Sequence, residues 1–425
     1  MSERDHDVFL LRPQVSDVFT PRRPEVNQEI YVDRPDLQTE LRRALLGSMH
    51  VVVTGESGSG KSWLYKKVLA DMASYVAVAN CGNADRLASV TQEIVDAIVP
   101  AGTAELTSYD EGKEAKVKAI FAEGDLSHSK TFEIKPEEPL LRAFRVMRKA
   151  AGHGRLAVLV LDNLEAIFPS IERMRELANI ILLLDDTRYA QFAIKILIVG
   201  TPARIRDYFS KTPMLQPVGN RLHEVEEVGP LSSGQVETLV TRGFFELLGF
   251  DLVPTELRQI SAHVLRITLG IAQPVHEYCE QLAYIISDNK KRFLPEHLGR
   301  ADRAWLKIGL RESYDVIERQ MNVRETKVGR RNQVLYALGA ITTKSFTSAA
   351  VETKVRCEFP DSTANAEQLG VGQLLVELTQ EKNPIVRRSR KSNEFEFTHP
   401  RFLMCIRAML EIDGGTSRVM RRELV

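Results

Sequence analysis

The sequence has few cysteines and no long apolar run. Cys81, Cys279, Cys357 and Cys405 are far apart and form no C-x-x-C pair. This spacing predicts neither a disulfide framework nor a zinc site, and it favours a reducing, cytoplasmic setting. No segment is long and apolar enough to cross a bilayer, and charge interrupts the short apolar run at 8–11, so neither a membrane span nor a signal peptide is predicted.

The chain also lacks net charge, because 57 Lys and Arg residues balance 57 Asp and Glu residues. Any contact with nucleic acid would therefore need a local basic patch. At 425 residues, and about 150 residues per domain, we expect two to four domains. The apolar and charged fractions are those of a soluble globular protein.

One glycine-rich stretch, GESGSGKS at 55–62, fits the pattern G-x-x-x-x-G-K-[ST] at every position. A β-branched apolar run at 50–54 precedes it and a helical pattern at 63–72 follows, so the glycines fall at a strand-to-helix turn. Such a turn lets phosphate oxygens approach the backbone N–H groups at a helix start. Lys61 would reach the β- and γ-phosphates, and Ser62 would bind Mg²⁺. The candidate nucleotide-contacting residues here are Gly55, Glu56, Ser57, Gly58, Ser59, Gly60, Lys61, Ser62 and Trp63.

A second signal is the continuous apolar run 156–161, which ends at Asp162. The run predicts a central parallel strand that is buried on both faces. Its carboxyl end would bring Asp162 to the edge of the sheet where ligands of open α/β sheets bind. We therefore expect Asp162 to hold the Mg²⁺ that Ser62 also binds.

The phosphate loop and Asp162 together resemble those of AAA+ P-loop ATPases of the origin-recognition-like and STAND types. The resemblance implies an α/β P-loop NTPase core, with a parallel sheet flanked by helices, at 30–229. It also implies an α-helical lid at 230–301 and a C-terminal winged-helix domain at 302–413. An N-terminal arm at 1–29 and a charged tail at 414–425 complete the chain. ATP and Mg²⁺ are the implied cofactors, and a homo-oligomer that forms through the nucleotide interface is expected.

The resemblance also implies catalytic roles. Asn163 stands where the commonest AAA+ pattern has a glutamate, and an amide cannot accept a proton, so slow hydrolysis is expected. Glu165 would replace that glutamate if the backbone turns after Asp162. Thr201 matches the family's sensor position. Arg221 is the first candidate for an arginine that acts on a neighbouring subunit and Arg204 is the second, although either could be an ordinary surface charge.

Two further matches concern the nucleotide base. The segment 30–35 resembles the h-h-G-R element, with Asp33 in place of the glycine, so Arg34 is either close to the adenine or a plain surface residue. The segment 270–274 resembles the turn that STAND proteins place over the nucleotide, and it assigns Pro274 to the site. The second-sensor arginine is missing, with only Gln273 and His276 nearby.

Two surface regions leave alternatives open. The polar stretch 101–139 predicts a β-hairpin insertion, which is either a contact surface for a partner or a solvent-exposed decoration. The arm at 1–29 is expected to lie over the surface of the nucleotide domain.

The C-terminal wing carries a basic strip made of Arg387, Arg388, Arg390 and Lys391. This strip could contact DNA phosphates, but the preceding helix has almost no side chains suited to base recognition. The alternative is a winged helix that only packs on the ATPase core. Two functions therefore compete: a nucleotide-controlled ATPase that engages DNA or a DNA-bound complex, and a STAND-type signalling or anti-phage defence ATPase that regulates a partner effector protein.

Overall fold

The protein is described by a computed structural model that covers residues 13–99, 137–200, 205–212, 216–321, 329–389 and 393–424. It has two compact units, which we name by their content. The sheet unit comprises Arg34–Ser57 and Lys61–Gly229. The helical unit comprises Met1–Asp33, Gly58–Gly60 and Pro230–Val425. Within the described ranges, no helix combines the length and the apolar character that crossing a membrane requires.

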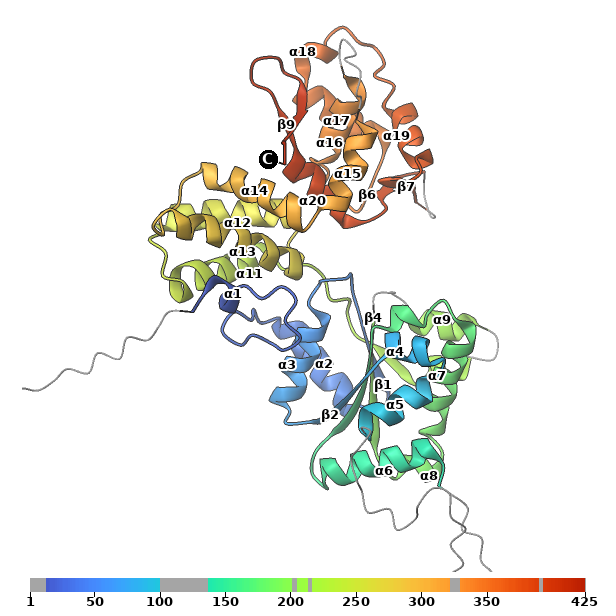
Figure 1. Cartoon of the computed structure of the whole chain (residues 1–425). Helices are drawn as coiled ribbons and strands as arrows, with labels where there is room; N and C mark the ends of the chain where they lie inside the picture. The colour runs from blue at the N-terminus through green and yellow to red at the C-terminus, as the bar shows by residue number, and fades with distance from the viewer. Residues whose placement is uncertain are drawn as a thin grey trace, which may run out of the picture. The chain divides into compact units, whose positions relative to one another are not determined.

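The sheet unit is built on five parallel strands in the order β2-β3-β4-β1-β5 (Figure 1). The strands are β1 (His50–Thr54), β2 (Tyr75–Asn80), β3 (Ala157–Asp162), β4 (Ile194–Gly200) and β5 (Leu222–Glu224). All residues of β1 and β4 are buried, as are all of β3 except its last. This explains why these strands appear as continuous apolar runs in the sequence. The predicted α/β P-loop NTPase core is confirmed.

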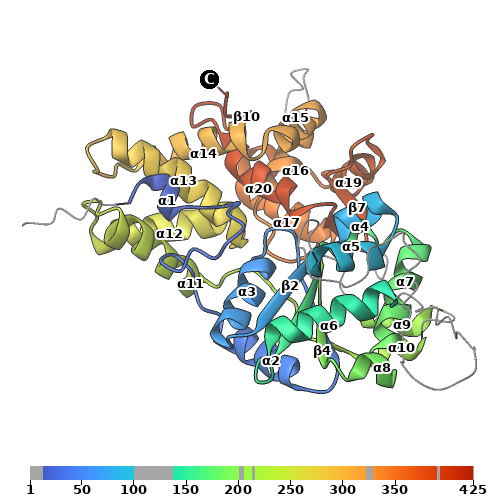
Figure 2. The ribbon, with the colours of Figure 1, turned by 60° about the horizontal axis from the view of Figure 1, so that its bottom comes forward.

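Helices cover both faces of this sheet. On one face, α2 (Pro35–Leu46) and α3 (Lys61–Asp71) pack Leu41, Leu64 and Val68 against β1, β3 and β4. The other face carries the remaining helices of the unit, several of which lie in front of the sheet in Figure 2. They are α4 (Cys81–Leu87), α5 (Val90–Ile98), α6 (Pro139–Ala151), η1 (Leu164–Ala166), α7 (Ile171–Leu183), α8 (Thr187–Ala190), α9 (Ile205–Lys211) and α10 (Gln216–Gly219).

Local interactions set the bounds of several elements. Helices α4 and α5 are separate because Ala88 takes a left-handed conformation and the Ser89 side chain caps α5. Strand β5 ends at Glu224, although the Val225 and Val228 N–H groups still donate to carbonyls of β1. Before α2, Ile30 closes a turn by donating to the Asn27 carbonyl.

The first part of the helical unit corresponds to the predicted lid. Its elements are α11 (Ser233–Val240), the π-helix η2 (Thr241–Leu247), α12 (Pro254–Thr268), α13 (Ala272–Asp288) and α14 (Glu296–Ile308). Helix α14 ends at Ile308, and after a break the chain continues as α15 (Arg311–Gln320). Gly309 lies at the break, where an added Cβ would stand 2.7 Å from the Trp305 indole nitrogen.

The N-terminal arm belongs to the helical unit, so the prediction that it covers the nucleotide domain is wrong. Phe19, after the short helix α1 (Val15–Val18), is fully buried, with its ring centroid 5.0 Å from that of Phe244 in η2. The Asn27 side chain fixes the arm by donating to the Asp17 and Val18 carbonyls. The buried apolar side chains of the arm, among them Val18 and Phe19, explain this placement.

The last part of the chain combines helices with short strands. Its elements are α16 (Arg330–Leu338), β6 (Ser345–Phe346), α17 (Ser348–Glu358), α18 (Pro360–Thr363), α19 (Val371–Gln380), β7 (Val386–Arg388), β8 (Phe395–Phe397), α20 (Pro400–Met409), β9 (Leu410–Ile412) and β10 (Val419–Arg421). Strands β6, β8 and β7 form an antiparallel sheet in that order, and β9 pairs with β10. Strand β10 lies within the predicted tail at 414–425.

Candidate functional site

The glycine-rich loop joins β1 to α3, which begins at Lys61. Gly58 and Gly60 have φ angles of 79° and 96°, a backbone conformation that residues other than glycine rarely adopt. The Lys61 ammonium turns back over the loop and donates to the carbonyls of Gly55, at 2.8 Å, and Glu56, at 3.0 Å. The loop thus presents its backbone, with a cation already on it, at the start of a helix.

The other predicted loop residues lie on the same turn. Ser59 is buried, Glu56 and Ser57 are exposed, and Ser62 and Trp63 are half-buried in the first turn of α3. Ser62 follows Lys61 directly and is therefore positioned, as predicted, at the start of the helix whose N–H groups would face an anion.

The Lys61 ammonium is partly buried and is surrounded by carboxylates. Burial lowers the pKa of this ammonium group, and the carboxylates of Glu165, Asp162, Glu56 and Glu227 oppose that effect without overcoming it. Four carboxylates of the sheet unit are therefore near enough to act on one lysine. Glu227 was not predicted; it lies just after β5, where the chain still follows β1 to the phosphate loop.

Asp162 is the last residue of β3 and lies beside Asn80, the last residue of β2. Its carboxylate accepts hydrogen bonds from the Tyr65 hydroxyl at 3.0 Å and from the Asn163 N–H at 2.9 Å. Burial and the Asp162 charge raise the pKa of Tyr65, so this hydroxyl remains a donor. Tyr65 and Asn80 were both missed, although Tyr65 follows Lys61 by one helical turn and Asn80 is the last residue of β2.

The backbone turns directly after Asp162. Asn163 has a left-handed conformation, with φ 61°, and its side-chain amide donates to the Asn80 side-chain oxygen at 3.3 Å. The chain then enters η1, which contains Glu165. Among the charged groups that raise the pKa of Lys61, Glu165 has the largest effect. The turn on which the predicted role of Glu165 depends is therefore present.

The donor set at this edge suits Mg²⁺. No cluster of three or more His, Cys, Asp or Glu side chains able to hold a metal is found in the described part of the chain. Protein sites for Mg²⁺ in nucleotide complexes usually supply one or two carboxylates and leave the other positions to phosphate oxygens and water. Asp162 and the Ser62 hydroxyl are such donors, and ATP would supply the phosphates.

Within the helical unit, the turn before α13 contacts the loop residue Gly58. The Gln273 N–H donates to the Gly58 carbonyl at 2.9 Å. A Cβ added to Gly58 would stand 3.1 Å from Gln273 Cβ and 3.6 Å from Pro274 Cδ, so only glycine allows this approach. His276 is buried, which lowers its pKa to about 4, and it is therefore neutral at physiological pH.

Arg34 and Arg221, two of the arginines predicted to act at the site, lie in different surroundings. Arg34 is 7% exposed and donates to the Gly229 carbonyl at 2.8 Å, so it is not a plain surface residue. Arg221 directly precedes β5, and its carbonyl accepts the N–H of His50, the first residue of β1. It is thus at the amino ends of the strands, away from the phosphate loop, and its side chain pairs with Asp185.

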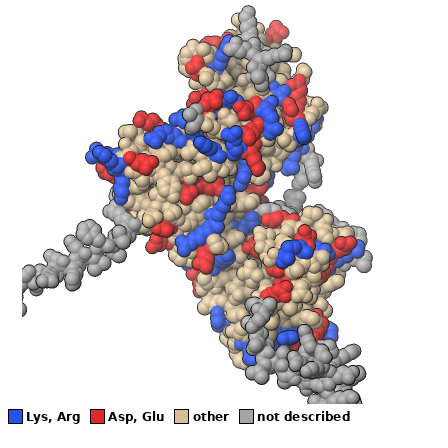
Figure 3. All heavy atoms as spheres, viewed as in Figure 1, with Lys and Arg blue, Asp and Glu red and all other residues tan. Residues whose placement is uncertain are grey.

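Several predicted positions lie outside the described residues. They are Thr201, Arg204, Arg390, Lys391 and most of the insertion at 101–139. Of the basic strip, Arg387 forms an ion pair with Glu396 at 2.9 Å, and Arg388 lies 5.8 Å from the centroid of the Phe395 ring. Acidic and basic side chains are mixed over much of the surface in the view of Figure 3.

The comparisons with known proteins bear first on the sheet unit. Residues 45–209 match the AAA domain family. The matched range includes the phosphate loop, Asp162 and Glu165, and it ends before Arg221 and the helices that follow. A search of curated proteins found no match to the chain.

One solved structure shows a likeness of fold beyond the range that the family model matches. A Walker-type ATPase of Pyrococcus abyssi matches with a TM-score of 0.52 and 16% identity, over 92% of this chain and 99% of that chain. A weaker match is Cdc6p of Pyrobaculum aerophilum, with a TM-score of 0.45 and 16% identity, over 92% of this chain and 96% of that chain. Another is the Aeropyrum pernix Orc1 protein in complex with DNA, with a TM-score of 0.43 and 15% identity, over 92% of this chain and 95% of that chain. At this identity, the likeness to the first protein concerns the fold alone.

Proposed function

We propose that this protein is an Mg-ATP-dependent, slowly hydrolysing AAA+ ATPase that acts as a nucleotide-controlled, oligomerising switch. The observation that carries the proposal is the Lys61 ammonium on the Gly55 and Glu56 carbonyls, beside the carboxylates of Asp162 and Glu165. A polyphosphate would replace the two carbonyls as the partner of Lys61. Mg²⁺ held by Ser62 and Asp162 would neutralise the carboxylates that otherwise repel the phosphates.

Slow turnover follows from the residues after Asp162. An amide at Asn163 cannot accept a proton from water. We assign the positioning of the attacking water to Glu165, since it lies in the turn directly after Asp162. Thr201 and Arg221 retain their proposed roles as a sensor and as the arginine that acts on a neighbouring subunit. Arg221 would then act only in trans, because it lies at the opposite edge of its own sheet.

Calorimetric titration with Mg-ATP tests the nucleotide site. Lys61→Ala should weaken binding at least about tenfold, because it removes a charge-assisted contact to the phosphates. Lys67→Ala is the matched control: it removes an ammonium group from the same helix, where Lys67 pairs with Asp71. No uptake of ATP by the folded wild-type protein, or equal uptake by both variants, would contradict the proposal.

We further propose that the chain engages DNA through a winged helix within 302–413. The order of α16, β6, α17, α19, β7 and β8, with β8 between β6 and β7, supports a winged helix. Duplex binding should fall steeply with salt and should be lost when Arg387, Arg388, Arg390 and Lys391 are all replaced by Ala. Replacing four other exposed cations of the helical unit, Lys290, Lys291, Lys307 and Arg311, is the matched control.

One observation favours the second candidate, a STAND-type switch that regulates a partner protein. Arg387 and Arg388 both have partners within their own sheet, so part of the basic strip is already engaged. Light scattering with ATP, ADP or no nucleotide, each with and without duplex DNA, separates the two functions. An ATP-dependent increase in mass without DNA binding would support the partner-regulating function and contradict the DNA-engaging one.

A further inference from the structure

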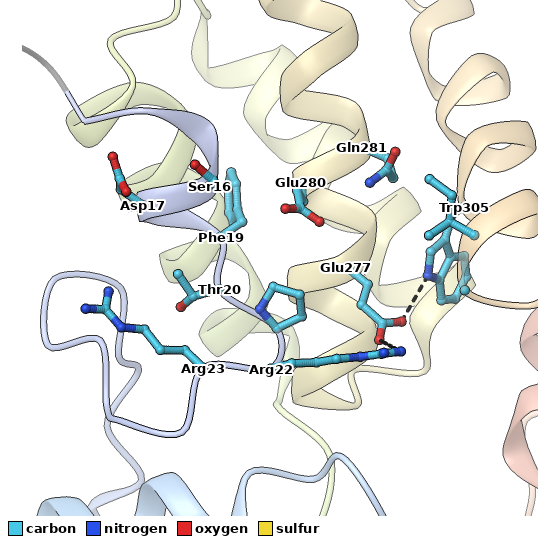
Figure 4. A pocket seen from close by; sticks show the side chains of 13 residues that line it. Ser16, Asp17, Phe19, Thr20, Arg22, Arg23, Glu277, Glu280, Gln281 and Trp305 are labelled. Carbon is cyan, nitrogen blue, oxygen red and sulfur yellow. Dashed lines mark hydrogen bonds and ion pairs between the residues drawn. The ribbon is translucent and has the colours of Figure 1, made fainter.

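A cavity of about 600 Å³ lies within the helical unit, between the N-terminal arm and the helices α13 and α14 (Figure 4). None of the phosphate-loop residues lines it. Its walls are formed by the arm residues 16, 17 and 19–23 and by Glu277, Glu280, Gln281, Trp305, Ile308 and Gly309.

The centre of the cavity carries the Glu277 carboxylate. Figure 4 shows it between the Arg22 guanidinium and the Trp305 indole. The indole N–H donates to it at 3.3 Å, and the Gln273 side-chain amide donates to it at 2.8 Å. Arg22 approaches only to 3.7 Å, with its side chain 75% exposed. Such an exposed, long ion pair contributes little, so another cation can replace Arg22.

A second carboxylate, Glu280, lies three residues further along α13 and also lines the cavity. It makes no ion pair with the described residues. Burial raises its pKa, the Gln281 side chain opposes that rise with a hydrogen bond, and the charge of Glu277 adds to it. Of the three carboxylates that line the cavity, Asp17, Glu277 and Glu280, the last two are therefore neighbours on α13. Glu277 has only a weakly bound cation, and Glu280 has no ion pair with the described residues.

An independent feature of the same wall is Thr20. Thr20 is 9% exposed, and its hydroxyl is buried with no hydrogen-bond partner among the described residues. A buried hydroxyl without a partner costs about 1–3 kcal/mol. A ligand that displaces Arg22, two residues further along the arm, would be able to supply the missing partner.

Polar and apolar side chains share the rest of the wall. Ser16, Asp17, Arg23 and Gln281 are its polar members. The apolar members include Phe19 and Trp305, which are buried, and Ile308, which is 69% exposed. A hydrocarbon stem that lies against Ile308 would remove apolar surface from water.

We propose that this cavity is a binding site for a guanidinium or primary ammonium group carried on an apolar stem. The cation lies between Glu277 and Glu280 and displaces Arg22, one of its N–H groups donates to the Thr20 hydroxyl, and the stem packs against Ile308. An arginine or lysine side chain of a partner peptide and a free polyamine both have this chemistry.

Calorimetry on the full chain without nucleotide tests the site independently of the proposed ATPase function. The probes are N-acetyl-arginine-methylamide, the matched uncharged N-acetyl-citrulline-methylamide, and spermidine. The charged probes should bind, with the citrulline compound at least about tenfold weaker. Binding of the arginine probe alone assigns the site to a peptide side chain, and binding of spermidine assigns it to a free polyamine.

Three variants probe the individual contacts. Glu280→Gln should weaken binding about tenfold, and Thr20→Val, which keeps the side-chain shape, about threefold. Arg22→Ala should strengthen binding, because it removes the competing cation. Glu246→Gln, an exposed carboxylate of the same unit outside the cavity, is the control and should change nothing.

Thermal unfolding of each variant confirms that it is folded before its affinity is compared. The proposal is overturned if neither charged probe binds at millimolar concentration. It is equally overturned if folded Glu280→Gln and Thr20→Val bind as the wild type does, or if Arg22→Ala fails to increase the affinity.

Discussion

Two aspartates, Asp162 in the sheet unit and Asp302 in the helical unit, show how similar side chains serve different purposes. Asp302 is fully buried and accepts hydrogen bonds from the His263 ring and the Tyr278 hydroxyl, each at 2.8 Å, and from Arg422. Asp162 is half-buried and accepts two, from Tyr65 and the Asn163 N–H. A carboxylate can accept about four hydrogen bonds. Asp302 is enclosed by its partners, whereas Asp162, at the carboxyl end of β3, can accept further hydrogen bonds beyond those from the described residues.

The difference indicates that Asp302 stabilises the fold, and it supports the proposal that Asp162 binds a ligand. Burial alone would raise the pKa of Asp302, but the His263, Arg422 and Tyr278 contacts together lower it. The folded state therefore favours the ionised form. Asp302 contributes stability above its unfolded pKa of about 3.9, and this contribution is lost as the pH falls through the lower folded pKa.

The largest expected effect is on Asp302. Asp302→Ala should lower the free energy of unfolding by about 3–5 kcal/mol, since it removes the buried acceptor that His263, Tyr278 and Arg422 share. Urea unfolding measures the change. Asp288→Ala, which removes an exposed aspartate of α13, is the control, and a similar small loss in both variants would contradict the comparison.

The milder Asp302→Asn variant sharpens the test. Its difference from the wild type should be full at neutral pH and should shrink as the pH falls below about 3.9, because the wild-type carboxylate then becomes protonated. A difference that stays constant from neutral pH to pH 3 would show that charge has no part in the effect.

Asp162→Asn should show the opposite behaviour. We expect ATP turnover to fall about a hundredfold, because an amide is a poor ligand for Mg²⁺, while the free energy of unfolding changes by less than about 1 kcal/mol. Phosphate release and urea unfolding measure the two quantities. Asp71→Asn, at the end of α3, is the control. A loss of turnover that merely follows a loss of stability would remove the distinction between the two aspartates.

Packing of the arm gives a third, intermediate effect within the helical unit. A Cβ added to Gly243 would stand 2.5 Å from Phe19 Cζ, and the Phe19 ring cannot move freely because it is buried against Phe244. Gly243→Ala should therefore destabilise the protein by about 1–3 kcal/mol.

Two further variants check that explanation. Gly234→Ala adds the same methyl group where nothing lies within 4 Å, and it should be neutral or slightly stabilising. Combining Gly243→Ala with Phe19→Leu should cost less than the sum of the single changes, because the shorter side chain makes room. Additive costs would show that the contact is not the cause.

The smallest effect is expected in the sheet unit at Glu176. Its carboxylate accepts hydrogen bonds from the Ser89 hydroxyl and from the Val90 and Thr91 N–H groups, at 2.8–2.9 Å, and so caps α5 from α7. Burial raises its pKa, but these hydrogen bonds lower it more. Glu176→Gln should cost about 1 kcal/mol at neutral pH, and less as the pH falls through the folded pKa. Glu172→Gln, exposed on α7, should leave the unfolding curve unchanged.

The sequence predicted best where one short pattern determines the local structure. The phosphate loop and the buried strands were found because glycine spacing and continuous apolar runs report directly on backbone geometry. The neighbours of Asp162 were harder to predict. Asn80 becomes its neighbour only through the strand order β2-β3, and the sequence does not state that order.

Contacts between distant segments could not be predicted at all. Phe19 and Gly243 show no signal of their pairing, and the glycine looks like an ordinary helix breaker until the ring beside it is seen. The same holds for Arg221, whose ion pair with Asp185 depends on where two separate loops meet.

The helical unit is built from segments that are far apart in the sequence, and this has a consequence for biosynthesis. Its N-terminal segment leaves the ribosome before any part of the sheet unit does. The helices that cover Phe19 are translated only after the sheet unit is complete. The nascent arm must therefore keep its apolar side chains in solution, or on a chaperone, until those helices emerge. The sheet unit can meanwhile fold with all its strands already synthesised, so closure of the helical unit is the later step.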